Sequence, residues 1–170
     1  MISSAVALPL FSPLLQACLK PGNGRLNEGN EQYKYFMYAI TKEVYFCYGH
    51  RLMNHPGKCR NLHGHSVKAA ITITREQLDA QDMVCDFSDI KACVDDYVDR
   101  VLDHNFLLHR DDPIIPLLKQ NNERFLVLQE HPTAEVLARM IFQHVQRSGF
   151  AVDQVVLWET ASANACYRED

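Results

Sequence analysis

Two runs of alternating apolar and polar residues, at 38–50 and 63–74, limit the possible folds of this chain most strongly. Side chains of a strand point alternately to its two faces, so each run predicts a strand with one apolar face. The even-numbered residues of the first run and the odd-numbered residues of the second supply those faces, with Lys42 as an exception. A loop rich in turn residues separates the runs, and we expect both strands to lie in one sheet.

The remaining pattern predicts helices packed on that sheet. Apolar residues at three- to four-residue spacing favour two helices, with Ser88 and Thr133 as plausible N-caps. The elements predicted downstream are helices at 88–102 and 134–147, a possible edge strand at 125–128, and a strand at 154–160. This order of elements predicts an α+β fold, an antiparallel sheet with helices on one face.

The composition is that of a globular protein that needs no disulfides. Apolar residues make up 47% of the 170 residues and charged residues 22%, which excludes a disordered or fibrous chain. The net charge is −4 and no basic stripe is visible, so we expect no nucleic-acid partner. The six cysteines form no C-x-x-C pair, which favours a reducing, cytoplasmic compartment.

The first 36 residues differ from the rest of the chain. An apolar stretch at 5–19 is interrupted by Pro9 and Pro13 and is shorter than the roughly 20 residues that span a bilayer, so we expect no membrane segment. No positive charge precedes this stretch, which argues against a signal peptide, although a cleaved signal stays a second interpretation. We therefore expect a loosely attached extension at 1–36 and a folded domain at 37–170.

Three histidines gather at one end of the two long predicted strands. His63 and His65 flank a single glycine, so their imidazoles point to the same side of a strand. His50 ends the preceding strand and faces the same way if the two strands pair. Three neutral imidazoles with an open fourth position are typical of a catalytic zinc site. The spacing alone also fits surface or core histidines without a metal.

Cys59 is a candidate for acid–base or nucleophilic chemistry. It stands between Lys58 and Arg60, four residues before the first histidine of the H-G-H motif. Two cations and a nearby metal favour a thiolate, which could act as a nucleophile or a base. A metal-ligating cysteine or an inert loop thiol fits the same position.

Three further residues carry side chains suited to proton transfer or ligand binding. Asp103 precedes His104 at a predicted helix end, but adjacent side chains rarely face each other, and such a histidine more often interacts with the helix dipole. Glu159 stands on a mainly apolar strand. A carboxylate in that position is either paired in the core or binds a ligand with amidine-like N–H groups.

Seven short motifs together resemble one enzyme family. They are FCYGHRL (46–52), KCRNLHGH (58–65), VCDF (84–87), LDHNFL (102–107), PTAEVLA (132–138), WET (158–160) and CYR (166–168). Their order and spacing are similar to those of the 6-pyruvoyl-tetrahydropterin synthase family, which includes the 6-carboxy-5,6,7,8-tetrahydropterin synthases of queuosine biosynthesis. The joint match covers about 38–170, and the C-x-x-x-H-G-H spacing resembles that of the queuosine-branch enzymes.

The resemblance implies a role for each candidate residue. It implies three ligands for Zn²⁺, namely His50, His63 and His65. It implies a general base and two residues that relay its proton, namely Cys59, Asp103 and His104. Glu159 would anchor the 2-amino-4-oxo edge of a pterin, in a pocket bordered by Thr133 and Glu135.

The same resemblance implies a fold, an assembly and a reaction. The tunnelling fold has a four-stranded antiparallel sheet with two helices, and its trimers form a barrel and stack as a homohexamer. Active sites then lie between subunits, so Asp103 and His104 could serve a neighbouring chain's Cys59. The implied carbon–carbon lyase converts 7,8-dihydroneopterin triphosphate to 6-carboxytetrahydropterin, acetaldehyde and triphosphate. The alternatives are elimination of triphosphate alone, as in 6-pyruvoyl-tetrahydropterin synthase, or a non-catalytic zinc- or pterin-binding protein.

Three features depart from the family pattern. Tyr48 and Gly49 precede the first histidine, where small residues are common, Leu108 replaces an asparagine, and 109–131 is longer than in the shortest members. We expect Tyr48 and the long loop to change the shape of the pocket. The basic residues that are candidates for binding the triphosphate are Arg51, Lys58 and Arg60.

Overall fold

The computed structural model describes residues 37–169, and the extension predicted at 1–36 lies outside them. In chain order the elements are β1 (Tyr38–His50), β2 (His63–Arg75), α1 (Phe87–Tyr97), β3 (Asn105–His109), α2 (Ile115–Gln120), β4 (Phe125–Leu128), α3 (Ala134–Arg147), β5 (Val152–Thr160) and β6 (Ala163–Tyr167). A 3₁₀ turn at Lys58–Arg60 and a π turn at Val98–Leu102 complete them. The described part of the chain contains no helix that is long and apolar enough to cross a membrane.

The six strands form one mixed sheet in the order β4-β3-β1-β2-β5-β6. The pairs β1–β2, β2–β5 and β5–β6 are antiparallel, whereas β3 runs parallel to both β1 and β4. The α+β class and the edge strand at 125–128 are confirmed. The expectation of four antiparallel strands was wrong, because β3 and β6 are only five residues long and show no alternation that marks them in the sequence.

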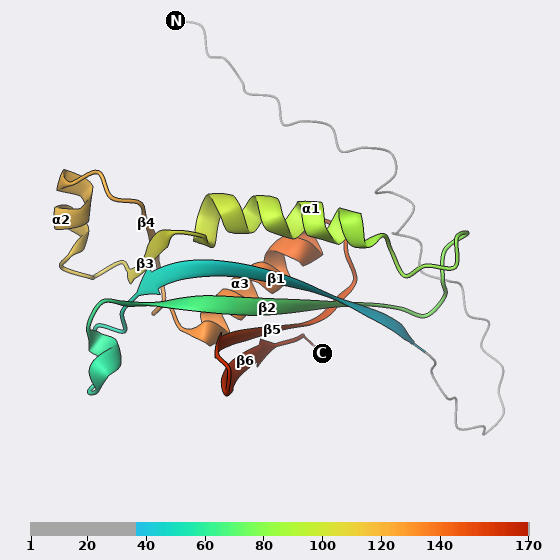
Figure 1. The fold of residues 1–170 in the computed structure, drawn as a ribbon, viewed down its shortest axis with the longest axis horizontal. Helices are drawn as coiled ribbons and strands as arrows, with labels where there is room; N and C mark the ends of the chain where they lie inside the picture. The colour runs from blue at the N-terminus through green and yellow to red at the C-terminus, as the bar shows by residue number, and fades with distance from the viewer. Residues whose placement is uncertain (1–36, 170) are drawn as a thin grey trace, which may run out of the picture. The chain divides into compact units, whose positions relative to one another are not determined.

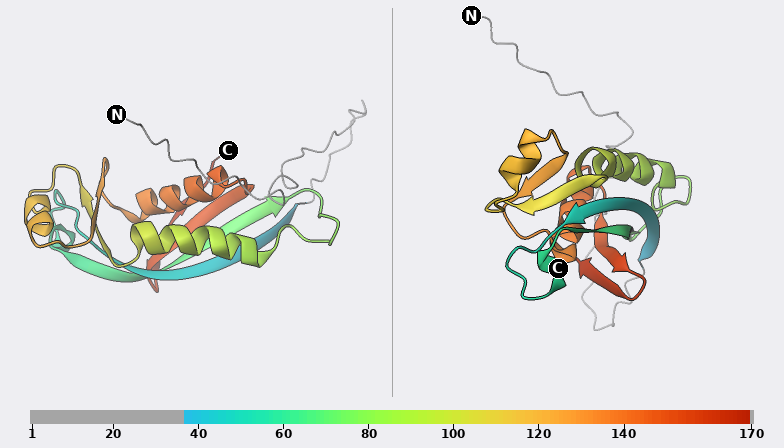
Figure 2. Two further views of the ribbon diagram at one scale, coloured as in Figure 1. Left: turned by 90° about the horizontal axis from the view of Figure 1, so that it is seen from above. Right: turned by 60° about the vertical axis from the view of Figure 1, so that its left-hand side comes forward.

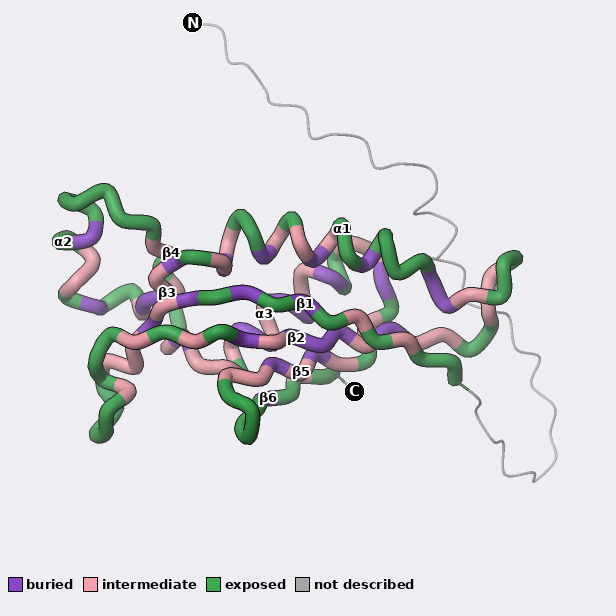
Figure 3. The backbone as a smooth tube through the Cα atoms, viewed as in Figure 1, coloured by how far each residue is buried: buried purple, intermediate pink, exposed green. Residues whose placement is uncertain are grey.

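One face of the curled sheet carries the core, and α1 and α3 cover that face (Figures 1 and 2). The register of β1 and β2 places Val44 opposite Ala69 and Phe46 opposite Val67, so the two predicted apolar faces coincide. β5 extends the same face with Leu157, which lies opposite Ala69. Figure 3 shows the resulting alternation of buried and exposed positions along β1. Among residues 37–169 no helix packs on the other face of the sheet (Figure 2).

The predicted helices are present, with one difference at a cap. Asp86 is the N-cap of α1 in place of Ser88, because its carboxylate accepts the Ser88 backbone N–H at 2.7 Å. The π turn then continues α1 to Leu102, which completes the predicted span. Thr133 caps α3 as predicted. The first turn of α3 lies near the end of the sheet that carries His50, His63 and His65.

Candidate metal and substrate site

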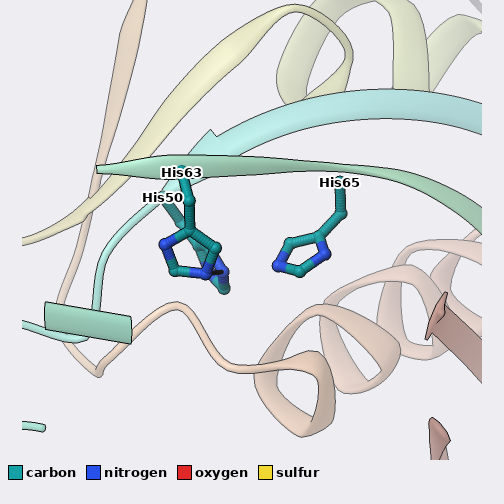
Figure 4. A group of neighbouring side chains, drawn as sticks. All are labelled: His50, His63 and His65. Carbon is teal, nitrogen blue, oxygen red and sulfur yellow. Dashed lines mark hydrogen bonds between the residues drawn. The ribbon is translucent and has the colours of Figure 1, made fainter. Parts of the chain in front are cut away.

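Three histidine side chains meet at one end of the sheet (Figure 4). His50 is the last residue of β1 and pairs in register with His63, the first residue of β2. His65 lies two positions further along β2, so all three imidazoles point to the same face. One ring nitrogen from each histidine lies within 4.8 Å of the others. The structure thus brings together the three residues that the sequence spacing grouped.

Hydrogen bonds fix the tautomers of two of these histidines. His50 Nδ1 lies 2.6 Å from the carbonyl oxygen of Pro132, and His63 Nδ1 lies 2.8 Å from that of Asn61. A carbonyl oxygen only accepts, so in the neutral rings both Nδ1 atoms carry the proton and both Nε2 atoms present a lone pair. These two Nε2 atoms lie 3.1 Å apart, and neither can donate to the other.

His65 completes a set of donors that suits a cation. Its Nε2 is buried and has no hydrogen-bond partner among the described residues. Burial lowers the pKa of His50, which is 2% exposed, and therefore favours the neutral form that binds metals. Two imidazole lone pairs thus converge with a third ring nitrogen that has no partner among the described residues, and three such nitrogens suit a tetrahedral metal ion with one open position. The cluster could therefore hold a metal ion.

A carboxylate and a phenol lie beside the histidines. Glu159 Oε1 on β5 is 4.0 Å from His50 Nε2, and the Tyr48 hydroxyl donates to the same oxygen at 2.5 Å. Burial, followed by this bond to Glu159, raises the pKa of Tyr48, so the phenol remains protonated and donates. The Glu159 side chain is 25% exposed. It is therefore paired within the fold and still open to a ligand.

The start of α3 lies next to this group. The Pro132 carbonyl that fixes His50 directly precedes the helix, and the Thr133 hydroxyl is used to cap its first turn. Glu135 is exposed on that turn. After burial and the bond to Glu159, the charge of Glu135 also contributes to the raised pKa of Tyr48, which indicates that it lies near the phenol. Thr133 and Glu135, which were predicted to border the pocket, thus lie at the end of the sheet that carries the three histidines.

Cys59 lies on the 3₁₀ turn within the loop that joins β1 to β2. Its carbonyl oxygen accepts the Leu52 N–H at 2.9 Å, which folds the loop back on the end of β1. The residue is half-buried. Within residues 37–169 neither Lys58 nor Arg60 forms an ion pair, so both cations are available to an anion. The loop therefore brings a thiol and two positive charges to the end of the sheet where the histidines lie.

Asp103 and His104 form a hydrogen-bonded pair, contrary to the expectation for adjacent side chains. His104 Nδ1 lies 2.7 Å from Asp103 Oδ2. His104 adopts a left-handed backbone with φ of 52°, a conformation that the sequence argument did not consider. Asp103 Oδ1 accepts the Cys47 N–H at 2.8 Å, and the His104 N–H donates to the Cys47 carbonyl at 2.7 Å. The pair is therefore fixed to β1, with the imidazole oriented by the carboxylate.

The oriented imidazole borders an open pocket of about 590 Å³ that is lined by residues of β1, β2 and β3. Gly49 is needed in that wall, because a Cβ atom there would lie 2.7 Å from the ring of Phe106. The His104 side chain is 75% exposed. Within the described residues no hydrogen bond joins His104 to Cys59 or to the histidine cluster. In the described part of one chain, the Asp103–His104 pair is thus not hydrogen-bonded to the predicted base Cys59.

Comparison with known proteins places the chain in a family. The family model described as 6-pyruvoyl tetrahydropterin synthase matches residues 39–170. The 6-carboxy-5,6,7,8-tetrahydropterin synthase of Haemophilus influenzae is 33% identical over 141 residues, which cover 78% of this chain and 100% of that protein. The chain belongs to the 6-pyruvoyl tetrahydropterin synthase family. A second relative is the 6-carboxy-5,6,7,8-tetrahydropterin synthase of Aquifex aeolicus. It is 35% identical over 126 residues, which cover 66% of this chain and 77% of that protein.

Solved structures agree with the fold of this family. An uncharacterised protein from Wolinella succinogenes superposes with a TM-score of 0.68 at 26% identity, covering 79% of this chain and 99% of that one. The 6-pyruvoyl tetrahydropterin synthase of Caenorhabditis elegans gives a TM-score of 0.61 at 19% identity, covering 82% and 100%, and supports the fold alone. The tunnelling fold is confirmed, and as a member of the 6-pyruvoyl tetrahydropterin synthase family the chain is an enzyme of the tetrahydropterin synthase type.

Arg51, one of three candidates for binding the triphosphate, has another partner within the fold. Its Nε donates to Asp112 Oδ2 at 2.7 Å, and its terminal nitrogen donates to Oδ1 of the same carboxylate. The Asp112 carboxylate is buried, whereas the Arg51 side chain is 20% exposed. This pair fixes the loop before α2 to the end of β1. Lys58 and Arg60 therefore remain the better candidates for a substrate anion in this 6-pyruvoyl tetrahydropterin synthase family member.

Replacing Arg51 tests whether this pair is structural. Arg51→Ala is expected to lower the free energy of unfolding by about 2–4 kcal/mol, because Asp112 stays buried without its partner. Burial alone raises the pKa of Asp112, but Arg51 and the Ile114 N–H hold it below the usual range. The stabilisation is therefore present at neutral pH and is lost as the pH falls through the lowered pKa. Urea unfolding of the wild type and the variant should differ at pH 7 and converge in acid.

The control is Arg100→Ala, which removes an exposed ion pair with Asp96. That change is expected to cost less than about 1 kcal/mol. If Arg51→Ala lowers the free energy of unfolding no more than Arg100→Ala does, the Arg51–Asp112 pair does not hold the loop.

Proposed function

We propose that this protein is a 6-carboxy-5,6,7,8-tetrahydropterin synthase of queuosine biosynthesis. It converts 7,8-dihydroneopterin triphosphate and one molecule of water to 6-carboxytetrahydropterin, acetaldehyde and triphosphate. The observation that carries the proposal is the Glu159 carboxylate, which lies 4.0 Å from Nε2 of His50. One substrate can therefore contact the carboxylate with its ring and the histidine cluster with its side chain. The names of the Haemophilus and Aquifex relatives support this choice.

Glu159 binds the pterin ring in this mechanism. The 2-amino group and the neighbouring ring N–H are two parallel donors, which match the two oxygens of a carboxylate. The N-terminal end of α3 borders the same region through Thr133 and Glu135. The positive charges of Lys58 and Arg60 attract the triphosphate despite the net charge of −4.

The chemistry requires a metal and a base. His50, His63 and His65 fit Zn²⁺, since their lone pairs converge and leave a fourth position open. When bound, Zn²⁺ supplies Lewis-acid polarisation of the side-chain hydroxyls of the substrate. Cys59, between Lys58 and Arg60, is the base that removes the proton from the substrate side chain. Loss of triphosphate and cleavage of the carbon–carbon bond follow.

Asp103 and His104 relay the proton from Cys59 of a neighbouring subunit. Asp103 keeps the proton of His104 on Nδ1, which leaves Nε2 free to accept from a thiol. Within residues 37–169 of one chain this exposed imidazole forms no hydrogen bond with Cys59, so in this proposal a second copy completes the site. Among residues 37–169 the edge strands β4 and β6 each have one side without a partner strand, which is suitable for closing a barrel of subunits. The proposed assembly is a homohexamer of two trimers.

Mixed oligomers test this placement directly. Cys59→Ala and His104→Ala are each expected to be inactive, but subunits of the two variants mixed in equal amounts should regain about a quarter of wild-type activity, since each site combines residues of two chains. The measurement is turnover after co-expression of the two variants, with each variant expressed alone as the control. No recovery in mixed oligomers of normal size would show that Cys59 and His104 act within one chain.

The release of acetaldehyde distinguishes the proposed reaction from its alternatives. We expect one acetaldehyde for each 7,8-dihydroneopterin triphosphate consumed, measured by coupling to alcohol dehydrogenase. Consumption of substrate without acetaldehyde would favour the 6-pyruvoyl-tetrahydropterin synthase reaction. Binding without consumption would favour a non-catalytic zinc- or pterin-binding protein.

The proposal assigns the activity to residues 37–170. The family match begins at residue 39, within this range. The segment at 1–36 is a loosely attached extension in this proposal, and the enzyme acts in the cytoplasm. A chain that starts at Met37 retains every residue named in the site.

A further inference from the structure

Tyr48 lies between the histidine cluster and the carboxylate. It is 3% exposed, and its ring lies 5.1 Å from that of His50 and 5.8 Å from that of His65, measured between centroids. Its hydroxyl donates to Glu159 Oε1 at 2.5 Å. The phenol therefore forms part of the wall that joins the metal-binding face to the carboxylate.

The bond from Tyr48 is the only hydrogen bond that the Glu159 side chain receives within residues 37–169. A carboxylate has about four acceptor positions on its two oxygens. The phenol occupies one of them, so a ligand with two parallel N–H donors can still bind. Without the phenol, nothing in the described part of the fold would direct this carboxylate, and it could turn toward His50, whose Nε2 is 4.0 Å away.

We propose that Tyr48 is a positioning residue, which holds Glu159 in the orientation that receives the paired N–H donors of a 2-amino-4-oxo pteridine. The inference rests on the proposed function and adds a determinant of ring selectivity to it. Tyr48 acts through Glu159 and not on the reacting bonds. Its loss should therefore weaken recognition of the ring more than it slows the chemical step.

Two ring systems separate this role from general damage to the pocket. Pterin carries the 2-amino group, whereas lumazine has an oxygen in its place and lacks one of the two donors. Both lack the triphosphate side chain, so they report on the ring-binding end of the site. Tyr48→Phe keeps the aromatic ring and removes only the hydroxyl. The affinity for pterin should therefore decrease, and the affinity for lumazine should stay nearly unchanged.

The test is the Kd of each ring for the metal-loaded protein, followed by pteridine fluorescence. Tyr48→Phe is expected to bind pterin about tenfold more weakly, as for loss of a hydrogen bond to a charged group, while the Kd for lumazine changes by less than about twofold. The metal content should stay equal to that of the wild type. In turnover assays KM should rise, with kcat changing much less.

The same strand provides a matched control. Tyr45 donates to Glu43 at 2.8 Å, which is also a tyrosine–glutamate bond on β1, but Tyr45 is exposed and belongs to the face without helices. Tyr45→Phe should leave both Kd values unchanged. In a Glu159→Ala background, Tyr48→Phe should cause no further loss of pterin binding.

An unchanged Kd for pterin in Tyr48→Phe, or equal weakening of pterin and lumazine, would overturn the inference. If the variant does not fold, a crystal structure of the wild type with pterin decides instead, since the phenol must remain within hydrogen-bond distance of Glu159. The proposed reaction is tested separately by wild-type turnover. A wild type that makes the product while Tyr48→Phe binds pterin normally would reject only the role of Tyr48.

Discussion

Replacing His63 with alanine is expected to remove the bound metal and to lower turnover by at least about a thousandfold, since a Lewis acid supplies several kcal/mol to such a reaction. His63 provides one of only three lone pairs in the cluster, and its Nδ1 is already engaged by the Asn61 carbonyl. A tetrahedral zinc site with one open position requires three protein ligands, and only two imidazoles remain in this variant. The measurement is zinc per subunit by elemental analysis, together with turnover.

His55→Ala is the matched control for this prediction. His55 lies in the same loop, but its Nδ1 accepts the Gly57 N–H at 2.9 Å and it is not in the cluster. Zinc content and turnover should both stay near the wild-type values. One zinc per subunit in His63→Ala would remove His63 from the set of ligands.

Replacing Cys59 with alanine should have a different signature, in which metal and fold are kept and turnover is lost. We expect a decrease of about 10²–10⁴-fold, the range for removing a general base. Cys59 is not one of the three residues that could hold the metal, so the zinc content should not change. The measurements are turnover, zinc content and the far-ultraviolet circular dichroism spectrum.

Alkylation of the wild type gives a second measurement on the same thiol. Burial raises the pKa of Cys93, so little of that thiol is ionised, and iodoacetamide should modify Cys59 well before Cys93. Cys166→Ala, at an exposed edge strand, should keep full turnover and serves as the control substitution. Turnover close to the wild-type rate in Cys59→Ala would exclude this residue as the base.

The long elements could be predicted from the sequence, and the short ones could not. β1, β2 and α3 each contain enough residues for their periodicity to identify one buried face. The same periodicity placed His50, His63 and His65 on one side, which the strand register then brings together. β3 and β6 pair with longer neighbours, and those backbone bonds leave no mark on five-residue sequences. Their omission produced the wrong count of strands.

Contacts between distant residues explain what the sequence did not reveal at the site. The bond between Tyr48 and Glu159 depends on the register of β5 against β2, and the pair of Arg51 with Asp112 joins residues 61 positions apart. Neither is visible in a local pattern. The bond between Asp103 and His104 was discounted for the opposite reason, because a local rule ignored the left-handed backbone of His104.

The mass of the pterin product tests the central claim most directly. The wild-type protein, loaded with zinc and incubated with 7,8-dihydroneopterin triphosphate, should yield a product with the mass of 6-carboxytetrahydropterin, and Glu159→Ala should yield none at the same substrate concentration. A product with the mass of 6-pyruvoyltetrahydropterin, or recovery of unchanged substrate, would contradict the proposed function.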